Sequence, residues 1–417
     1  MQKIQGADGM RAIACLLVLV HHLSQRMFPF ANSEGWQLAQ FIGMSFNVGV
    51  SVFFVLSGML LAKPFWEAHF AGASAPRLGV YAVRRAARIV PGFYLVTVVF
   101  FLLQSVILTQ PADNPDQWLR LATSLTFTTG LHWSTFFPNM LNGPLWSISL
   151  EVISYILLPF CLLPLFRLRL PRGAAFASVY CLSIFGLIFA ANAAVHYFFH
   201  TPDAGKGWEF GLQGGAKYWL PNYNPIGFFA QFWLGSCTAG IITMIQSAAW
   251  RGRARQLGLF DLFAVLALVS GTGLLIWTMT QRTGEFALGW QQQPYHFPYF
   301  AGLTGLALIC GAHSRWIGAA LDNRLFRYIA SVSFGVYLWH FGIMEVINKV
   351  WIPDYRYFGM RDGVLFWQLT GIVVAVTFAI GTASFYFLER PMMRWAKRRF
   401  ESGLVESAKV GTTVNVA

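Results

Sequence analysis

Charged residues are scarce in this chain of 417 residues: only 11% are charged, 17 of them acidic and 30 basic. A typical soluble domain carries about 25% charged residues, so the shortage excludes an ordinary soluble fold. Apolar residues take their place, at 56% of the chain with a mean hydropathy of +0.52. This composition predicts a polytopic membrane protein.

Motifs of several soluble enzyme classes are also missing. The chain has no Walker loop, no dinucleotide-binding fingerprint and no nucleophile elbow, which argues against the enzymes that they mark. No internal repeat is visible, so an inverted-repeat transporter has no support. The five cysteines lie in apolar segments without metal-ligand spacing, so we expect packing residues, no disulfides and no metal site.

Apolar runs of about 20 residues, the length that crosses a bilayer, recur along the chain. They predict ten membrane helices, at 11–30, 46–63, 89–109, 144–166, 174–198, 225–246, 259–280, 297–312, 328–350 and 363–388. We therefore expect an all-α membrane bundle of about ten transmembrane helices over residues 1–400, followed by a disordered tail at 401–417. The first segment is interpreted as a retained helix because no small-residue cleavage site follows it.

The connections between these helices alternate sharply in basic content. About 22 of the 30 lysines and arginines fall on one side, which is the positive-inside pattern. They include Lys3, Arg77, Arg84, Arg85, Arg88, Arg167, Arg169, Arg172, Arg251, Arg253, Arg255, Arg315, Arg324, Arg327, Arg390, Arg394, Lys397, Arg398 and Arg399. We expect both termini to be cytoplasmic. The surplus charge then reflects orientation and contact with anionic membrane lipid, not a nucleic-acid partner.

Among the ionisable residues inside these predicted helices, four stand out: Arg11, His22, Glu151 and His340. Arg11 and His22 are eleven residues apart, so they share a helix face and lie about 16 Å apart along its axis. Each residue of an α-helix advances about 1.5 Å along the axis, so depth can be counted from the helix ends. This count places His22, Glu151 and His340 at a similar depth in a membrane core of about 30 Å. Ionisable groups at that depth are costly, so they are candidates for a functional site. Each one alone could also be structural, as a bridge between helices or a neutralising charge.

Two further patterns accompany these residues. Ser333, Tyr337 and His340 are spaced i, i+4, i+7 and form one polar stripe on an apolar helix. Arg85 and Arg88 lie in the expected cytoplasmic loop after the second helix, and their i, i+3 spacing suits the capture of phosphates. Contact with lipid headgroups is the alternative interpretation of this arginine pair.

The order of six short motifs resembles acyltransferase family 3, the ten-helix membrane acyltransferases that acylate exported glycans and some small molecules. The motifs are Asp8 to Ala14 followed by His22, Phe53 to Gly58 (FFxxSG), Arg85 to Arg88 (RxxR), Trp146 to Glu151 (WSLxxE), Ser333 to His340 (SYxxYLxH) and Glu389 to Pro391 (ERP). Phe334 departs from the usual tyrosine. Because the chain stops soon after the last predicted helix, we expect no appended hydrolase-like domain.

This resemblance implies an O-acyltransferase of the bacterial inner membrane. Its co-substrate would be cytoplasmic acyl-CoA, with acetyl-CoA as the expected form and no permanently bound cofactor. The acceptor would be a hydroxyl of a lipid-linked or exported saccharide. Arg85 and Arg88 would bind the donor phosphates, and Arg11 would either hold donor phosphate or help to orient the thioester.

The resemblance also suggests roles for the residues inside the membrane. His22 would act as the base or as a transient acyl carrier, and Glu151 would orient an imidazole or stabilise its protonated form. Tyr337 and His340 would donate hydrogen bonds to the developing oxyanion. A proton-coupled transporter, with His22, Glu151 and His340 as a relay, is the alternative function.

Aromatic and amide residues fill the loops that we expect on the outer side. They are Trp118, His132, Trp133, Phe136, Phe137, Trp208, Trp219, Tyr223, Trp290, Gln291, Gln292, Gln293, Tyr295 and His296. Such side chains suit sugar rings, but Trp and Tyr also gather at membrane interfaces for other reasons.

Overall fold

The computed structural model describes residues 4–28, 34–108, 115–199, 216–217, 220–280 and 293–399. In this part of the chain nine helical stretches are long and apolar enough to cross a membrane, and the shorter apolar helix α13 (Tyr299–His313) makes a tenth. The expected all-α membrane bundle of about ten helices is therefore confirmed. The predicted tail at 401–417 lies outside the described residues.

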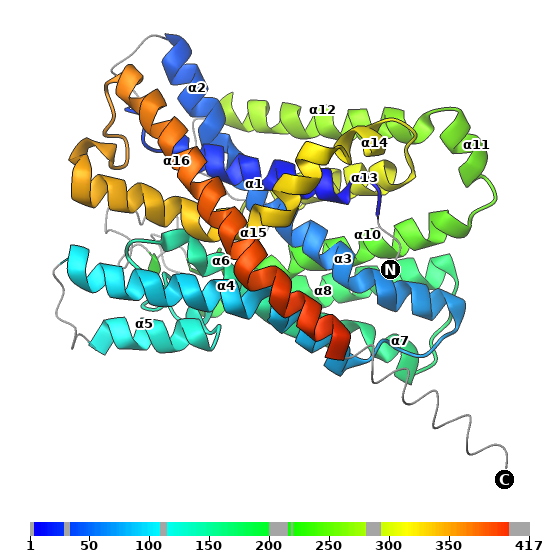
Figure 1. Cartoon of the computed structure of the whole chain (residues 1–417). Helices are drawn as coiled ribbons and strands as arrows, with labels where there is room; N and C mark the ends of the chain where they lie inside the picture. The colour runs from blue at the N-terminus through cyan, green and yellow to red at the C-terminus, as the bar shows by residue number, and fades with distance from the viewer. Residues whose placement is uncertain are drawn as a thin grey trace.

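The long helices form one bundle in which α12 lies on one side and α4 with α5 on the other (Figure 1). The main helices are α1 (Ala7–Ser24), α3 (Gly49–Ala71), α4 (Leu78–Ile107), α6 (Trp146–Leu162), α8 (Ala174–Phe199), α10 (Pro225–Ser247), α12 (Leu259–Thr280), α13, α15 (Arg324–Val346) and α16 (Gly363–Ser384). Shorter α-helices are α2 (Glu34–Met44), α5 (Pro115–Leu125), α7 (Pro164–Arg167), α11 (Arg251–Gln256) and α14 (Ile317–Leu321). The short 3-10 and π-helical segments are η1 (Ser45–Val48), η2 (Thr129–Leu131), η3 (Gly143–Leu145), η7 (Ile347–Trp351), η8 (Pro353–Tyr355) and η9 (Phe385–Glu389).

The prediction that Arg85 and Arg88 lie in a loop is wrong. Helix α4 begins at Leu78, not at residue 89, so both arginines lie within its first three turns. No Pro or Gly stands between Val80 and Val90 to stop the helix, and the apolar-run criterion failed because the arginines themselves break the apolar run. The pair is therefore held rigidly on a helix.

Helices α3 and α10 approach each other closely enough for their backbones to touch. A Cβ atom at Gly58 would lie 1.9 Å from the carbonyl oxygen of Phe232, and one at Gly235 would lie 2.0 Å from that of Val55. Only glycine fits at such a contact. This packing fixes the position of Ser57, which precedes Gly58.

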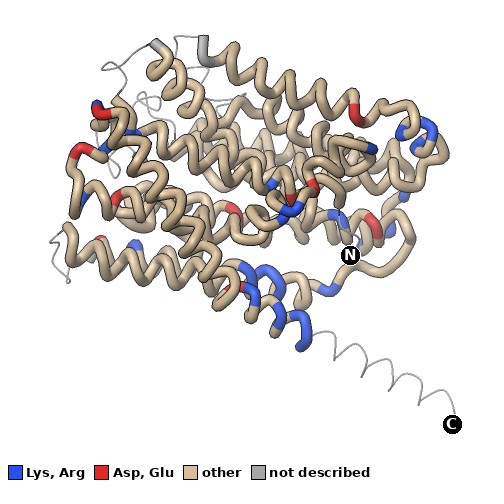
Figure 2. Tube along the Cα trace, turned by 45° about the horizontal axis from the view of Figure 1, so that its top comes forward, with Lys and Arg blue, Asp and Glu red and all other residues tan. Residues whose placement is uncertain are grey.

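Lysines and arginines are concentrated toward the end of the bundle at which α1 begins and the helical residues 390–399 end (Figure 2). We call this the basic end, and the opposite end the distal end. The asymmetry agrees with the alternation of charge along the sequence. The side of the membrane that each end faces remains a prediction.

Candidate functional site

Two of the three residues predicted at one depth meet in the structure. Nδ1 of His22 on α1 lies 3.1 Å from Nε2 of His340 on α15, and the ring centroids are 4.9 Å apart. His340 is buried, with 1% of its surface exposed, whereas His22 is partly exposed. The exposed member of the pair is therefore the one that a substrate can reach.

The hydrogen-bond partners around the two rings determine which nitrogen of each imidazole carries the proton. Nδ1 of His340 faces the carbonyls of Tyr337 at 2.7 Å and Val336 at 3.2 Å, and since carbonyls only accept, this nitrogen carries the proton. Nε2 of a neutral His340 then has a lone pair, so the proton in the contact comes from Nδ1 of His22, which also faces the carbonyl of Val18 at 2.9 Å. This assignment leaves the lone pair of His22 on Nε2. His22 is thus prepared to act as a base.

Glu151, the third residue, makes a different set of contacts. Its Oε1 accepts hydrogen bonds from the hydroxyl of Ser57, at 2.8 Å, and from that of Tyr155. Within the described residues, no hydrogen bond joins Glu151 to a histidine. The serine of the FFxxSG motif and the glutamate of the WSLxxE motif are therefore partners.

Tyr337 connects α15 to the start of α6. Its hydroxyl donates to the carbonyl of Pro144 at 2.9 Å and lies 2.6 Å from the hydroxyl of Ser147. A phenol has one proton to donate, and the Pro144 carbonyl accepts it here. In this arrangement Tyr337 positions helices, and its role toward an oxyanion remains a prediction.

The basic end carries a cluster of three arginines. The guanidinium of Arg11 on α1 interacts electrostatically with those of Arg85 and Arg88 on α4. Glu389 of the ERP motif, which is fully buried in η9, faces Arg88, and Asp8 faces Arg11. Glu151 also interacts electrostatically with Arg88, so the three arginines of this cluster face three carboxylates. Guanidinium groups are suited to bidentate contacts with phosphate oxygens.

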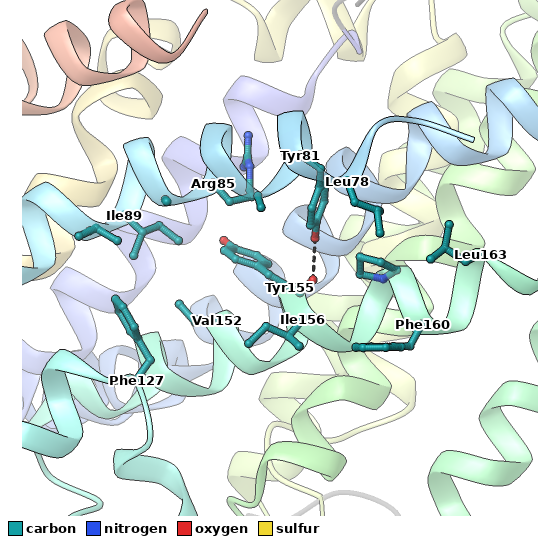
Figure 3. Close-up of a pocket in the computed structure, with 14 residues that line it drawn as sticks. Leu78, Tyr81, Arg85, Ile89, Phe127, Val152, Tyr155, Ile156, Phe160 and Leu163 are labelled. Carbon is teal, nitrogen blue, oxygen red and sulfur yellow. Dashed lines mark hydrogen bonds between the residues drawn. The ribbon is translucent and has the colours of Figure 1, made fainter. Parts of the chain in front are cut away.

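An apolar cavity of about 390 Å³ adjoins this cluster between α4 and α6 (Figure 3). Arg85 and Tyr155 border it, and the hydroxyl of Tyr81 donates to the carbonyl of Tyr155 at 2.9 Å. The other side chains of its wall are apolar: Leu78, Ala82, Ala86, Ile89, Val90, Phe127, Val152, Ile156, Pro159, Phe160 and Leu163. Because Tyr155 also hydrogen-bonds Glu151, it links the arginine cluster to the carboxylate inside the bundle.

A buried ion pair beside the histidines was missed by sequence reasoning. Nη1 of Arg26 lies 2.8 Å from Oε1 of Glu345, and its guanidinium lies over the rings of Phe341 and Tyr357 at 5.2 and 5.1 Å. The ring of Phe341 in turn packs edge-on against His22, with centroids 5.1 Å apart. The partner of Arg26 is set by the packing of α1 on α15, which the sequence does not give.

The aromatic residues expected on the outer side are only partly described. Trp208, Trp219, Trp290, Gln291 and Gln292 lie outside the described residues. Tyr223 and Tyr295 pack against each other with centroids 6.2 Å apart, and Tyr295 is buried at 5% exposure. These two tyrosines belong to the core of the bundle, so they are not part of an open sugar-binding surface.

Comparison with known families identifies the chain. A family model described as an acyltransferase domain, of the acyltransferase 3 type, matches residues 4–387. The chain belongs to the acyltransferase 3 family. The family expected from the six motifs is thereby confirmed.

Relatives of this acyltransferase 3 chain are named as O-acetyltransferases. A protein of Bacillus subtilis (strain 168) that is provisionally named peptidoglycan O-acetyltransferase YrhL is 25% identical over 409 residues, which cover 95% of this chain and 56% of the relative. The peptidoglycan O-acetyltransferase OatA of Listeria monocytogenes serovar 1/2a (strain ATCC BAA-679 / EGD-e) is 22% identical over 420 residues, with coverages of 94% and 56%. This chain therefore spans a little over half the length of these relatives. No solved structure matches it.

The motifs of the acyltransferase 3 family meet in three groups of side chains. Helices α1, α4 and η9 supply the arginine cluster with Glu389, α3 and α6 supply Ser57 and Glu151, and α1 and α15 supply the histidine pair. His22 lies about 16 Å from Arg11 along α1.

Proposed function

We propose that this membrane protein is an O-acetyltransferase of the bacterial inner membrane. It moves an acetyl group from cytoplasmic acetyl-CoA to a hydroxyl of a lipid-linked or exported glycan. Membership of the acyltransferase 3 family supports the activity, and the names of the relatives support a glycan of the peptidoglycan type as acceptor. The concentration of basic residues supports a cytoplasmic basic end.

The single observation that carries this proposal is the contact between His22 and His340. A sugar hydroxyl is a poor nucleophile, and a base that removes its proton during attack accelerates the reaction about 10²- to 10⁴-fold. Nε2 of His22 takes that proton while the hydroxyl oxygen attacks the thioester carbonyl. The C–S bond then breaks, and the proton passes from His22 to the departing thiolate, which gives the acetyl ester and free CoA. Throughout the reaction, Nε2 of His340 accepts the hydrogen bond that Nδ1 of His22 donates.

The donor binds at the arginine cluster in this proposal. Its diphosphate lies against Arg85 and Arg11, since Arg88 already interacts with the carboxylates of Glu389 and Glu151. Acetyl-CoA is a co-substrate, and the CoA that it leaves behind dissociates after each turnover. The separation of about 16 Å between Arg11 and His22 requires the thioester arm to extend along α1 into the bundle.

The alternative of a proton-relay transporter has less support. Such a relay needs His22, Glu151 and His340 in one hydrogen-bonded chain. The two histidines meet, but the hydrogen bonds of Glu151 within the described residues go to Ser57 and Tyr155.

The test is turnover of acetyl-CoA by the purified protein in nanodiscs, with release of free CoA as the measurement. We expect slow thioester hydrolysis in the wild type, a loss of at least 10²-fold in His22→Ala, and near wild-type turnover in His21→Ala. His21 is the matched control because its ring faces another helix, with Nδ1 2.8 Å from the carbonyl of Met44. No turnover and no binding of CoA by the folded wild type would refute the proposal.

A further inference from the structure

A second cavity, polar and of about 190 Å³, lies at the basic end and shares no residue with the arginine cluster. It is enclosed by the segment that precedes α1 and by α3, α10, α11 and α13. Its polar lining consists of Gln5, Lys63, Gln246, Arg251 and His313. At a share of about 30 Å³ per water, the cavity has room for roughly six waters.

The floor of this cavity holds cationic and nitrogen-rich side chains that are taken out of water. Lys63 and His313 are only 4% and 3% exposed, whereas Gln246 and Arg251 reach the surface at the mouth. Lys63 pairs with Glu67, one turn along α3, so its charge is compensated. The charge of Arg251 has no carboxylate partner among the ion pairs of the described residues.

Several donor atoms in this cavity have no partner. Neither ring nitrogen of His313 makes a hydrogen bond of ordinary geometry within the described chain, although the backbone of Ile242 lies close to the ring. Nε of Arg251 is likewise buried without a partner, while its Nη1 donates a long hydrogen bond of 3.5 Å to the carbonyl of Gln246. Buried polar atoms without partners are costly, so their presence together points to a ligand that accepts hydrogen bonds.

We infer that this cavity binds a phosphate group of a ligand from the aqueous side of the basic end. Lys63, Arg251 and His313 come from three different helices and converge on one space, and all of them can donate. A phosphate has several acceptor oxygens and a charge that matches this set. We call it the Lys63–His313 pocket.

The phosphate has two possible sources, which share this chemistry. One is the 3′-phosphate of the CoA donor, and this source rests on the proposed function. The other is a separate phosphate, either free or on a lipid headgroup. Acetyl-CoA and acetyl-dephospho-CoA differ only in the 3′-phosphate, so the pair separates the two sources.

The first experiment measures the affinity of both donors for the protein in nanodiscs. If the pocket holds the 3′-phosphate, the wild type binds acetyl-dephospho-CoA about tenfold more weakly than acetyl-CoA, as the loss of a charge-assisted contact predicts. Arg251→Gln and His313→Gln abolish this preference. Arg253→Gln keeps it, because Arg253 lies exposed on the same helix outside the pocket and controls for the loss of one charge.

The second experiment measures the melting temperature in inorganic phosphate against sodium chloride of equal ionic strength. A stabilisation by phosphate in the wild type and Arg253→Gln that is absent from Arg251→Gln supports the pocket with a separate phosphate as its ligand. Arg251→Lys keeps the positive charge, so we expect it to retain part of the donor preference or of the stabilisation by phosphate. It therefore keeps the test valid if Arg251→Gln fails to fold.

The inference is overturned if the wild type shows neither the donor preference nor the phosphate stabilisation. It is equally overturned if both responses survive in Arg251→Gln and His313→Gln. Failure of the proposed function gives a different result, because a protein without thioester turnover still reports on the pocket through its melting temperature.

Discussion

The position of His340 predicts that it acts through His22. His340 offers Nε2 as an acceptor to Nδ1 of His22 at 3.1 Å and is itself fixed by two carbonyls of its own helix. Its removal leaves the proton of His22 with the carbonyl of Val18 alone. The base then keeps its tautomer but loses one of the two contacts that orient its ring.

The magnitude follows from the energy of that contact. Loss of a buried hydrogen-bond partner costs about 1–3 kcal/mol, which corresponds to roughly 5- to 150-fold in rate. We expect His340→Leu, which keeps the volume, to lower kcat by about 10- to 100-fold and to leave the KM for acetyl-CoA within about twofold. His340→Gln restores most of the rate, because a glutamine oxygen can accept in place of Nε2.

The assay is steady-state release of CoA in nanodiscs, with the melting temperature of each variant as a check on folding. Wild-type turnover in His340→Leu would refute the reasoning, as would a glutamine variant no better than the leucine variant. Turnover as low as in His22→Ala, in a folded His340→Leu protein, would place His340 at the reacting atoms and contradict a positioning role.

Two further predictions concern the arginine cluster and the helix packing. Arg85→Ala should raise the KM for acetyl-CoA about tenfold, with a smaller effect at high salt, whereas the exposed neighbour Arg84→Ala should change it little; equal effects would contradict the assignment. Gly58→Ala should lower stability by about 1–3 kcal/mol, read as a lower melting temperature, since its Cβ would meet the carbonyl of Phe232. Gly79→Ala, where nothing lies within 4 Å, should be neutral or stabilising, and a loss of stability as large as that of Gly58→Ala would argue against the steric explanation.

Much of the fold followed from the sequence because apolar runs report directly on membrane spans. The helix 259–280 was predicted with the bounds that the structure gives. The similar depth of His22 and His340, which meet in the structure, could also be predicted, because depth can be counted along each helix separately. Helix starts were less predictable where arginines interrupt an apolar run, as they do ahead of residue 89 in α4.

The contacts between helices could not be predicted in the same way. A helical pattern tells which residues share a face but not which neighbouring helix that face meets. Glu389, which interacts electrostatically with Arg88, lies in the π-helical segment η9, and the ion pair of Arg26 with Glu345 depends on how α1 packs on α15. The sequence placed Glu151 in a membrane helix, as the structure does, but it did not predict the hydrogen bonds with Ser57 and Tyr155.

The buried ion pair at the distal end explains how the histidine pair is kept in register. Removing one partner of a buried pair costs about 3–5 kcal/mol because the other charge is left uncompensated, so Arg26 and Glu345 disfavour separation of α1 and α15 about one turn beyond His22. The backbone reinforces this junction, because the amide of Met360 donates to the carbonyl of Arg26 at 3.0 Å and that of Phe28 donates to the carbonyl of Met360 at 2.9 Å. A contact of 3.1 Å between imidazoles on two separate helices needs such a brace, since a shift of about 1 Å between the helices would break the hydrogen bond.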